Sequence, residues 1–347
     1  MKTLHLGHHF YGAGNLGDDF MLAGFLAALG SRAVKLTCCV PHPIGPLARR
    51  FPSVGWQDYD DSTRRRCIDD CDAWLGLGGS PWQAGVSSWF ADHLSKERRW
   101  CESAGKPMYF LCVGSQDRAG IANPELRAAA RQAQAIWTRD AAAVESLAGL
   151  AGAAGRVRAA ADLAHLFFEA HRPPPAAPGR LTAVLNFDYA GWPAMGAALA
   201  ALDRLHARER VWLAQEARAL PGAERELFKS LPEADRSRWG LRPADDSGPE
   251  LTRVLDRWPS SEWLLTSRYH ATLAGAWAGS RAVVITTNDK LRGVASEFGY
   301  PTLGPEDDPG GVVALLRSAT PPAESNLRLH ASAARTACGE FFDAVGI

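Results

Sequence analysis

Residues 263–290 read WLLTSRYHATLAGAWAGSRAVVITTNDK, and the pattern of this stretch decides the fold. Its first three residues and the run 282–285 are each apolar and short enough to form a buried parallel strand. The Ala-, Leu- and Trp-rich segment 271–278 is typical of a helix, and Gly279 follows it at the position of a helix stop. The stretch therefore predicts a strand, a helix and a second strand, with residues 267–270 at the turn between the first two.

The same alternation of apolar runs and helical segments extends along the chain. Because glycine-containing loops follow several of the runs, we predict an α/β protein with two Rossmann-like domains, each a doubly wound parallel sheet. The sequence RPPPAAPGR at 172–180 separates the halves, since three successive prolines cannot continue a helix and stiffen an extended connector. The predicted boundaries are a first domain over 1–172, a linker over 173–180, a second domain over 181–320 and a final helix over 321–347 that can pack back onto the first domain. The runs that we interpret as strands are 3–6, 34–40, 71–77, 107–113, 135–138, 181–187, 211–215, 263–265 and 282–285.

Charge and composition exclude several classes of function. The 347 residues include 38 Lys and Arg and 38 Asp and Glu, so no overall field attracts nucleic acid or an anionic membrane. No apolar run approaches the roughly 18 residues of a membrane span. The seven cysteines are scattered and show no zinc-binding or disulfide spacing. We expect a cytoplasmic protein with reduced cysteines, no metal requirement, and at most peripheral contact with the inner face of a membrane.

The turn at 267–270, with the sequence Ser-Arg-Tyr-His, is the first candidate for a functional site. In an open α/β sheet, ligands bind where strands end and helices begin, because helix N-termini present free N–H groups and a positive dipole end there. Arg268 suits an anionic group, and His270 suits proton transfer near neutral pH. A purely structural role for His270, as a hydrogen-bonded residue at a helix start, is the alternative.

A glycine-rich loop near the N-terminus is the second candidate. The sequence YGAGNLGDD at 11–19 contains G-x-G-x-x-G, the pattern of a dinucleotide-binding turn. Asp18 and Asp19 would repel a pyrophosphate there, and no acidic residue ends the following strand to bind a ribose. A structural turn is another alternative. We favour an active-site loop in which Asn15 and Asp18 offer polar groups to a sugar.

Small or basic residues end other predicted strands. The segments 79–80 and 114–116 either let a ligand approach the backbone closely or serve only as tight turns. Arg139 and Lys290 each follow a strand, where they suit the binding of a carboxylate or phosphate or lie simply in solvent.

Five short motifs occur in order along the chain: Y-G-A-G-N-L-G-D-D, G-G-S-P-W-Q, G-S-Q, W-T-R-D and S-R-Y-H. Together they resemble the polysaccharide pyruvyl transferase family over residues 11–290, and the first and last motifs are the most specific. The resemblance implies two domains arranged as in the GT-B glycosyltransferases. It also implies transfer of the enolpyruvyl-derived group of phosphoenolpyruvate to a sugar hydroxyl. The product would be a pyruvate ketal on a surface glycan or on its lipid-linked or nucleotide-linked precursor.

The resemblance also implies roles for single residues. Arg268 and His270 match the family's Ser-x-Arg-x-His signature, with Thr266 in place of the Ser. Arg139 and Arg268 would hold the two anionic groups of phosphoenolpyruvate from different domains. His270 would transfer a proton, and Asp18 would accept the proton of the sugar hydroxyl. The predicted catalytic residues are His270 and Asp18, and the predicted substrate-binding residues are Gly14, Asn15, Gly17, Gly79, Ser80, Gly114, Ser115, Gln116, Arg139, Ser267, Arg268 and Lys290.

Two other functions fit the same fold. A nucleotide-sugar glycosyltransferase would need a nucleobase and diphosphate site in the second domain, and no acidic residue for a ribose is evident near 268–270. A glycan-binding protein without catalytic activity would have little need for two arginines and a histidine at strand ends. The resemblance implies no cofactor besides the donor substrate.

Overall fold

The computed structural model describes residues 1–7, 11, 14–83, 89–116, 118–149, 155–187, 192–216, 222–244 and 250–347. The chain divides into two compact units. Unit 1 comprises Met1–Gly12, Asp18–Phe167 and Leu329–Ile347, and unit 2 comprises Ala13–Gly17 and Phe168–Arg328. Three helices, α1, α8 and α16, contain residues of both units.

In the described part of unit 1, parallel strands form a seven-stranded sheet in the order β3-β2-β1-β4-β5-β6-β7. The order reverses between β1 and β4, which is the switch point of a doubly wound sheet. The elements are β1 (Lys2–Leu6), α1 (Leu16–Leu29), β2 (Val34–Val40), α2 (Ile44–Arg50), β3 (Val54–Asp58), α3 (Asp61–Asp70), β4 (Ala73–Leu77), α4 (Trp89–Ser103), β5 (Met108–Val113), α5 (Arg118–Ala122), α6 (Pro124–Gln132), β6 (Ala135–Thr138), α7 (Ala141–Ala148), β7 (Val157–Ala159), α8 (Ala164–Ala170) and α16 (Glu324–Val345).

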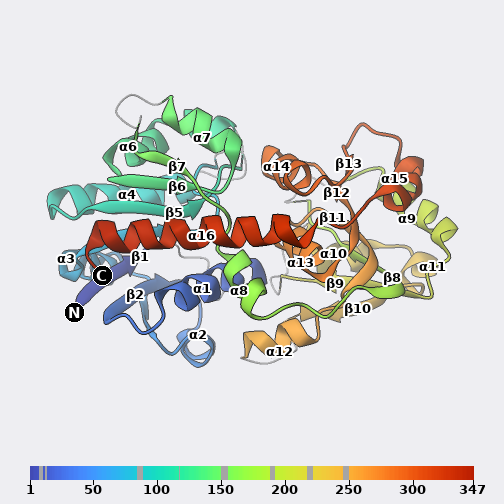
Figure 1. Cartoon of the computed structure of the whole chain (residues 1–347), viewed down its shortest axis with the longest axis horizontal. Helices are drawn as coiled ribbons and strands as arrows, with labels where there is room; N and C mark the ends of the chain where they lie inside the picture. Colours follow the sequence, from blue (N-terminus) through green and yellow to red (C-terminus); the bar gives the residue numbers. More distant parts are fainter. Residues whose placement is uncertain are drawn as a thin grey trace. The chain divides into compact units, whose positions relative to one another are not determined.

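Helices cover both faces of this sheet, so its strands are buried and their residues are almost all apolar. On one face, residues of α4, α6 and α7 form one apolar cluster with residues of β4, β5 and β6 (Figure 1). On the other face, Phe341 of α16 meets Tyr109 of β5 and Trp137 of β6 edge to face, with ring centroids 5.5 and 6.1 Å apart. Phe25 of α1 packs on the same Phe341. Unit 1 is therefore a three-layer α/β/α structure.

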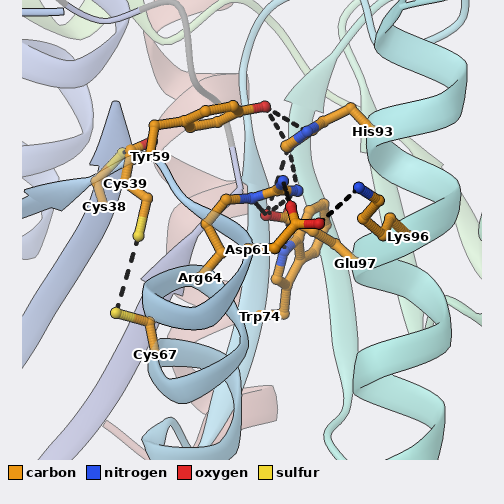
Figure 2. A network of polar contacts seen from close by, with 10 residues as sticks. All are labelled: Cys38, Cys39, Tyr59, Asp61, Arg64, Cys67, Trp74, His93, Lys96 and Glu97. Carbon is orange, nitrogen blue, oxygen red and sulfur yellow. Dashed lines mark hydrogen bonds and ion pairs between the residues drawn. The ribbon is translucent and has the colours of Figure 1, made fainter. Parts of the chain in front are cut away.

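A network of buried charges joins α3 to α4 within unit 1 (Figure 2). The Arg64 guanidinium donates from Nε and Nη2 to Glu97 Oε1, at 3.1 Å in each case, and Trp74 Nε1 donates to Glu97 Oε2 at 2.9 Å. Arg64 Nη2 also donates to His93 Nε2 at 3.0 Å. Because an arginine only donates, His93 must accept at Nε2 and carry its proton on Nδ1, which faces the Tyr59 hydroxyl. The network therefore joins α3 and α4 through side chains that are almost fully buried.

In the described part of unit 2, six parallel strands form a second sheet in the order β10-β9-β8-β11-β12-β13. Its switch point lies between β8 and β11. The elements are β8 (Ala177–Val184), α9 (Met195–Ala201), η1 (Leu202–Leu205), β9 (Glu209–Ala214), α10 (Glu224–Ser230), α11 (Glu233–Arg236), β10 (Gly240–Pro243), α12 (Leu251–Asp256), β11 (Ser261–Thr266), α13 (Tyr269–Ala278), β12 (Arg281–Ile285), α14 (Asp289–Phe298), β13 (Thr302–Leu303), η3 (Pro309–Gly311) and α15 (Val312–Ser318).

Alternate residues of the unit 2 strands face different helix layers. Leu265 of β11 belongs to an apolar cluster with α9 and α15, whereas its neighbour Leu264 faces α13. A Cβ on Gly275 of α13 would lie 2.4 Å from Leu264 Cδ2, so a larger residue here would have to displace the end of the Leu264 side chain. The same alternation that predicts a strand thus places α13 directly over β11.

The predicted fold class is confirmed, because both units are parallel Rossmann-like sheets. The units divide between Phe167 and Phe168, and β8 begins at Ala177, inside the predicted linker 173–180. Short elements that the sequence analysis did not predict include α2, β3, α3, β7, β10 and β13. Within the described residues, none of the helices combines the length and apolar character that crossing a bilayer requires.

Candidate functional site

The turn between β11 and α13 is held by hydrogen bonds at the carboxyl edge of the unit 2 sheet. Ser267 N–H donates to Val184 O at 3.0 Å, and Ser267 Oγ donates to Asn186 O at 2.6 Å while it accepts from Asn186 N at 2.7 Å. Arg268 has extended backbone angles as the N-cap residue of α13, and its N–H donates to Thr266 Oγ1 at 2.9 Å. The carboxyl ends of β8 and β11 are therefore fixed together at the switch point, where this fold binds ligands.

Arg268 points into a pair of buried carboxylates. Its Nε donates to Glu224 Oε1 at 2.5 Å, and its Nη2 pairs with Glu216 Oε2. The side chains of Glu216 and Glu224 are 3% and 0% exposed, and that of Arg268 is 14% exposed. Two anions thus surround one cation, so Arg268 is not a spare positive charge for a ligand.

Burial governs the protonation of this cluster. Burial raises the pKa of Glu224 above its usual value, and the adjacent Arg268 guanidinium offsets only part of that shift. Burial lowers the pKa of Arg268, but the two carboxylates raise it by more, so the guanidinium stays charged. Glu224 Oε2 is buried without a hydrogen-bond partner among the residues that the structure describes. These conditions favour a proton on Glu224 more than on an exposed glutamate.

The first glycine-rich loop reaches the same cluster within unit 2. Asn15 forms an isolated antiparallel bridge with Glu216, and Leu16 N–H donates to Gln215 O at 3.4 Å. Asn15 Oδ1 accepts from Gly17 N at 3.2 Å. The His270 ring lies against the Gly17 backbone, and a Cβ on Gly17 would lie 2.0 Å from His270 Nδ1. The loop and the α13 turn, 250 residues apart in the sequence, therefore form one site.

The structure brings five predicted site residues together here and adds two more. The predicted ones are Asn15, Gly17, Ser267, Arg268 and His270. The added ones are the carboxylates at 216 and 224. Glu216 directly follows the predicted strand 211–215. The rule that ligands bind at the carboxyl ends of parallel strands could therefore have identified it from the sequence. The second lies in the first turn of α10, where an acidic residue is ordinary and gives no functional signal.

Replacing Gly17 with alanine is expected to disturb this site directly. The new methyl group would overlap the His270 ring, and overpacking of this kind typically costs about 1–3 kcal/mol of unfolding free energy. Urea denaturation measures the loss. Gly196→Ala is the matched control, because no atom lies within 4 Å of its added Cβ on α9. The double variant with His270→Ala should recover the stability lost in Gly17→Ala, whereas equal stability of the two glycine variants would contradict the contact.

Six of the remaining predicted residues follow the carboxyl ends of β4, β5 and β6 in the unit 1 sheet: Gly79, Ser80, Gly114, Ser115, Gln116 and Arg139. Arg139 pairs through Nη1 with Asp162, whose side chain is 0% exposed, and its Nη2 donates to Ser80 Oγ at 3.2 Å. A Cβ on Gly114 would lie 2.2 Å from Asp140 Oδ2, which accepts from Ser115 N at 3.0 Å. Arg139 is therefore held in a buried ion pair.

The other predicted residues are placed as follows. Gly79 has a positive φ of 70° and donates to Met21 Sδ at 3.2 Å, Gln116 N–H donates to Trp82 O at 3.0 Å, and Gly14 has a positive φ of 82°. Lys290 is half-buried in the first turn of α14. No cluster of metal-ligating side chains occurs in the part of the chain that the structure describes.

Asp18 and Asp19 lie buried in the first turn of α1. Asp19 pairs with Arg50, and its side chain is 5% exposed. Burial raises the pKa of Asp19 to about 6, although Arg50 and its hydrogen bond act in the opposite direction.

This shift predicts the pH dependence of stability. Since the folded-state pKa exceeds the unfolded one, the folded state binds more protons between about pH 4 and 6, and stability falls as the pH rises through that window. Asparagine at position 19 cannot titrate. The unfolding free energy of the native chain should therefore fall by about 2 kcal/mol relative to Asp19→Asn between pH 4 and 7. Urea denaturation of both proteins across this range measures it, and parallel curves would contradict the prediction.

The fold matches solved structures of nucleotide-sugar proteins. No protein-family model and no curated protein sequence matches the chain. The UDP-N-acetylglucosamine 2-epimerase from Rickettsia bellii superposes with a TM-score of 0.65 at 10% identity, covering 99% of this chain and 95% of that one. The corresponding epimerase from Neisseria meningitidis, bound to UDP-GlcNAc, gives 0.60 at 12% identity and covers 99% of both chains. Anabaena HepE in complex with UDP gives 0.61 at 11% identity and covers 100% of both chains.

These matches correct the interpretation of the motifs. The predictions of a polysaccharide pyruvyl transferase and of phosphoenolpyruvate as its donor are wrong, because the similar structures are UDP-GlcNAc 2-epimerases and UDP complexes. The ion pairs agree with this correction. Arg139 and Arg268, the predicted ligands of the two anionic groups of phosphoenolpyruvate, are both already paired with buried carboxylates. What the likeness establishes is the architecture, two Rossmann-like parallel-sheet units of the GT-B type.

Proposed function

We propose that this chain binds a uridine nucleotide sugar and epimerises its sugar at the carboxyl edge of the unit 2 sheet. The observation that carries the proposal is the N-terminus of α13 at the switch point between β8 and β11, where Arg268 is the N-cap residue and His270 lies in the first turn. Open α/β sheets bind nucleotides at this point, with the pyrophosphate at a helix N-terminus. The complexes of similar folds with UDP and with UDP-GlcNAc support this choice of ligand.

Because of the charges around this turn, we place the diphosphate at the N-terminus of α13 rather than beside Arg268. Arg268 is already balanced by Glu216 and Glu224, so the N-terminus of α13 supplies the main attraction for an anion. Lys290, which follows the neighbouring strand β12, is a further cation on this edge.

The same cluster contains groups that move protons. Epimerisation removes a proton from a sugar carbon and returns one on the other face, which requires a base and an acid. The imidazole of His270 is a group that can accept or donate a proton, and burial raises the pKa of Glu224 above its usual value. Asn15 supplies an amide for a sugar hydroxyl beside them. These residues support acid–base chemistry on the sugar.

Binding is the first test of this proposal. The purified chain is heated with millimolar UDP, UDP-GlcNAc or UDP-glucose, and with ADP and CMP as nucleotide controls. We expect the uridine nucleotides to raise the midpoint of thermal unfolding, since a ligand that binds only the folded state stabilises it. The absence of any shift with all three uridine ligands would overturn the proposal.

The reaction is tested in heavy water. An epimerase places solvent deuterium on the carbon that it inverts, which proton NMR detects as loss of that signal in the recovered UDP-sugar. A glycosyltransferase instead releases UDP and leaves the sugar protons unexchanged. Binding with UDP release and without exchange would therefore favour glycosyl transfer over epimerisation.

A further inference from the structure

Two cysteines of unit 1 lie in contact beside the buried network of Figure 2. Cys39 is on β2 and Cys67 is on α3, and their Sγ atoms are 3.8 Å apart, with Cys39 as the hydrogen-bond donor (Figure 2). A disulfide requires about 2.05 Å between the sulfurs. The two sulfurs therefore have to approach each other by about 1.8 Å, which side-chain rotation can supply because β2 and α3 are already in contact.

Cys67 is the most accessible of the cysteines. All seven cysteines of the sequence are described, and all are free thiols. Cys67 is 8% exposed, whereas the other six are 0–1% exposed. Among these residues Cys67 therefore lies nearest to solvent, and a small oxidant has the shortest route to it.

The contact also separates the roles of the two sulfurs. The hydrogen bond from Cys39 lowers the pKa of Cys67, and Arg66 and Lys35 act in the same direction against the effect of burial. The same hydrogen bond and burial raise the pKa of Cys39. The thiolate, which is the reactive form, is thus favoured on Cys67, and the proton stays on Cys39.

We propose that Cys39 and Cys67 form an oxidation site, which a peroxide converts into a disulfide between β2 and α3. In the first step the Cys67 thiolate attacks hydrogen peroxide, which gives a sulfenic acid and hydroxide. In the second step Cys39 sulfur attacks the Cys67 sulfur, so that an S–S bond forms, the S–O bond breaks, and water leaves with the Cys39 proton. Two thiols are oxidised and one peroxide is reduced to two waters.

The disulfide would tie down the helix that carries Arg64. It closes the chain between residues 39 and 67 and thereby restricts the unfolded state of unit 1. We expect the oxidised protein to unfold at a higher temperature than the reduced protein, and a thiol reductant to reverse the shift. This inference does not depend on the nucleotide-sugar proposal.

The experiment treats the reduced full-length chain with hydrogen peroxide and follows its mass and thiols. Formation of the bond lowers the intact mass by about 2 Da, and once the treated chain is unfolded in denaturant, five of its seven thiols react with iodoacetamide. Trypsin then yields a linked pair of peptides, residues 36–49 and 67–96. Further cleavage at aspartate separates Cys67 from Cys71 and identifies the bonded sulfur. The same treatment in urea should give mixed pairings, because the native contact is lost.

Three variants distinguish the proposed pair from its neighbours. Cys38→Ala removes the adjacent thiol and should leave the linked peptides unchanged. Cys67→Ser should abolish the link. Cys39→Ser should leave Cys67 as a sulfenic acid, which dimedone traps. A link through Cys38 or Cys71, or oxidation of Cys67 to sulfinic acid in the native chain without a link, would overturn the proposal.

Discussion

Replacing Arg64 with leucine is expected to lower the free energy of unfolding by about 3–5 kcal/mol at neutral pH. The Arg64 side chain is 3% exposed, and the Glu97 side chain that it contacts is 0% exposed. Leucine would take the guanidinium away from a carboxylate that solvent does not reach, and the desolvation of that charge would no longer be offset. Urea denaturation followed by circular dichroism measures the change.

The neighbouring arginine on the same helix is the matched control. Arg65 pairs with Asp69 at 3.0 Å, but the two side chains are 39% and 45% exposed. Exposed pairs contribute only about 0–1 kcal/mol, so Arg65→Leu should change stability little. The double variant Arg64→Met with Glu97→Gln should recover much of the loss, because glutamine keeps an acceptor for Trp74 Nε1. Equal effects of the two leucine variants would show that the buried network does not stabilise unit 1.

Replacing His270 with alanine is expected to reduce turnover of a UDP-sugar by roughly 10²–10⁴-fold, the usual contribution of an acid–base group. Affinity for UDP should change little, because the proposed diphosphate site is the N-terminus of α13 rather than the imidazole. Steady-state kinetics gives the turnover, and calorimetric titration with UDP gives the affinity. The expectation rests on the contact of His270 with the loop at Gly17, because Asn15 of the same loop is bridged to the buried acid Glu216.

Two further variants separate proton transfer from packing. His270→Gln keeps hydrogen-bonding capacity and most of the volume but removes the imidazole that transfers the proton, so its turnover should be as low as that of the alanine variant. His206→Asn is the control, because His206 is exposed and has a left-handed backbone that asparagine tolerates. Full activity in His270→Gln would assign His270 a packing role and remove it from the chemistry.

The elements that the sequence predicts well are the buried ones. The stretch 263–290 predicts a strand, helix and strand that the structure places at Ser261–Thr266, Tyr269–Ala278 and Arg281–Ile285. These elements are covered on both faces, so their residues form continuous apolar runs that stand out from the polar turns. The position of the functional turn follows from them, because it lies between a strand and a helix.

Edge strands were missed because they lack such runs. β3 alternates buried and exposed residues over Val54–Asp58, and three of the four residues of β10 are exposed. A strand at the edge of a sheet needs few apolar residues and often carries polar ones. Local pattern alone therefore does not separate these segments from loops.

The family resemblance failed for a related reason. Its motifs lie at strand ends, and short runs of glycine and polar residues there are typical of turns in many two-domain α/β proteins. The Arg of W-T-R-D illustrates this, since Arg139 is buried in an ion pair with Asp162. A motif letter reports a residue type, whereas its charge environment depends on residues elsewhere in the chain.

By itself the sequence determined the α/β class, the parallel sheets and the turn at 267–270, because apolar periodicity and glycine placement are local properties. The tertiary structure alone decided what surrounds that turn. Arg268 meets Glu216 and Glu224, which are 52 and 44 residues away, and Asn15 meets Gln215 across 200 residues. Long-range pairing sets both the net charge and the protonation of the cluster. For that reason an arginine and a histidine that suggested an anion clamp form instead part of a balanced, acid-rich site.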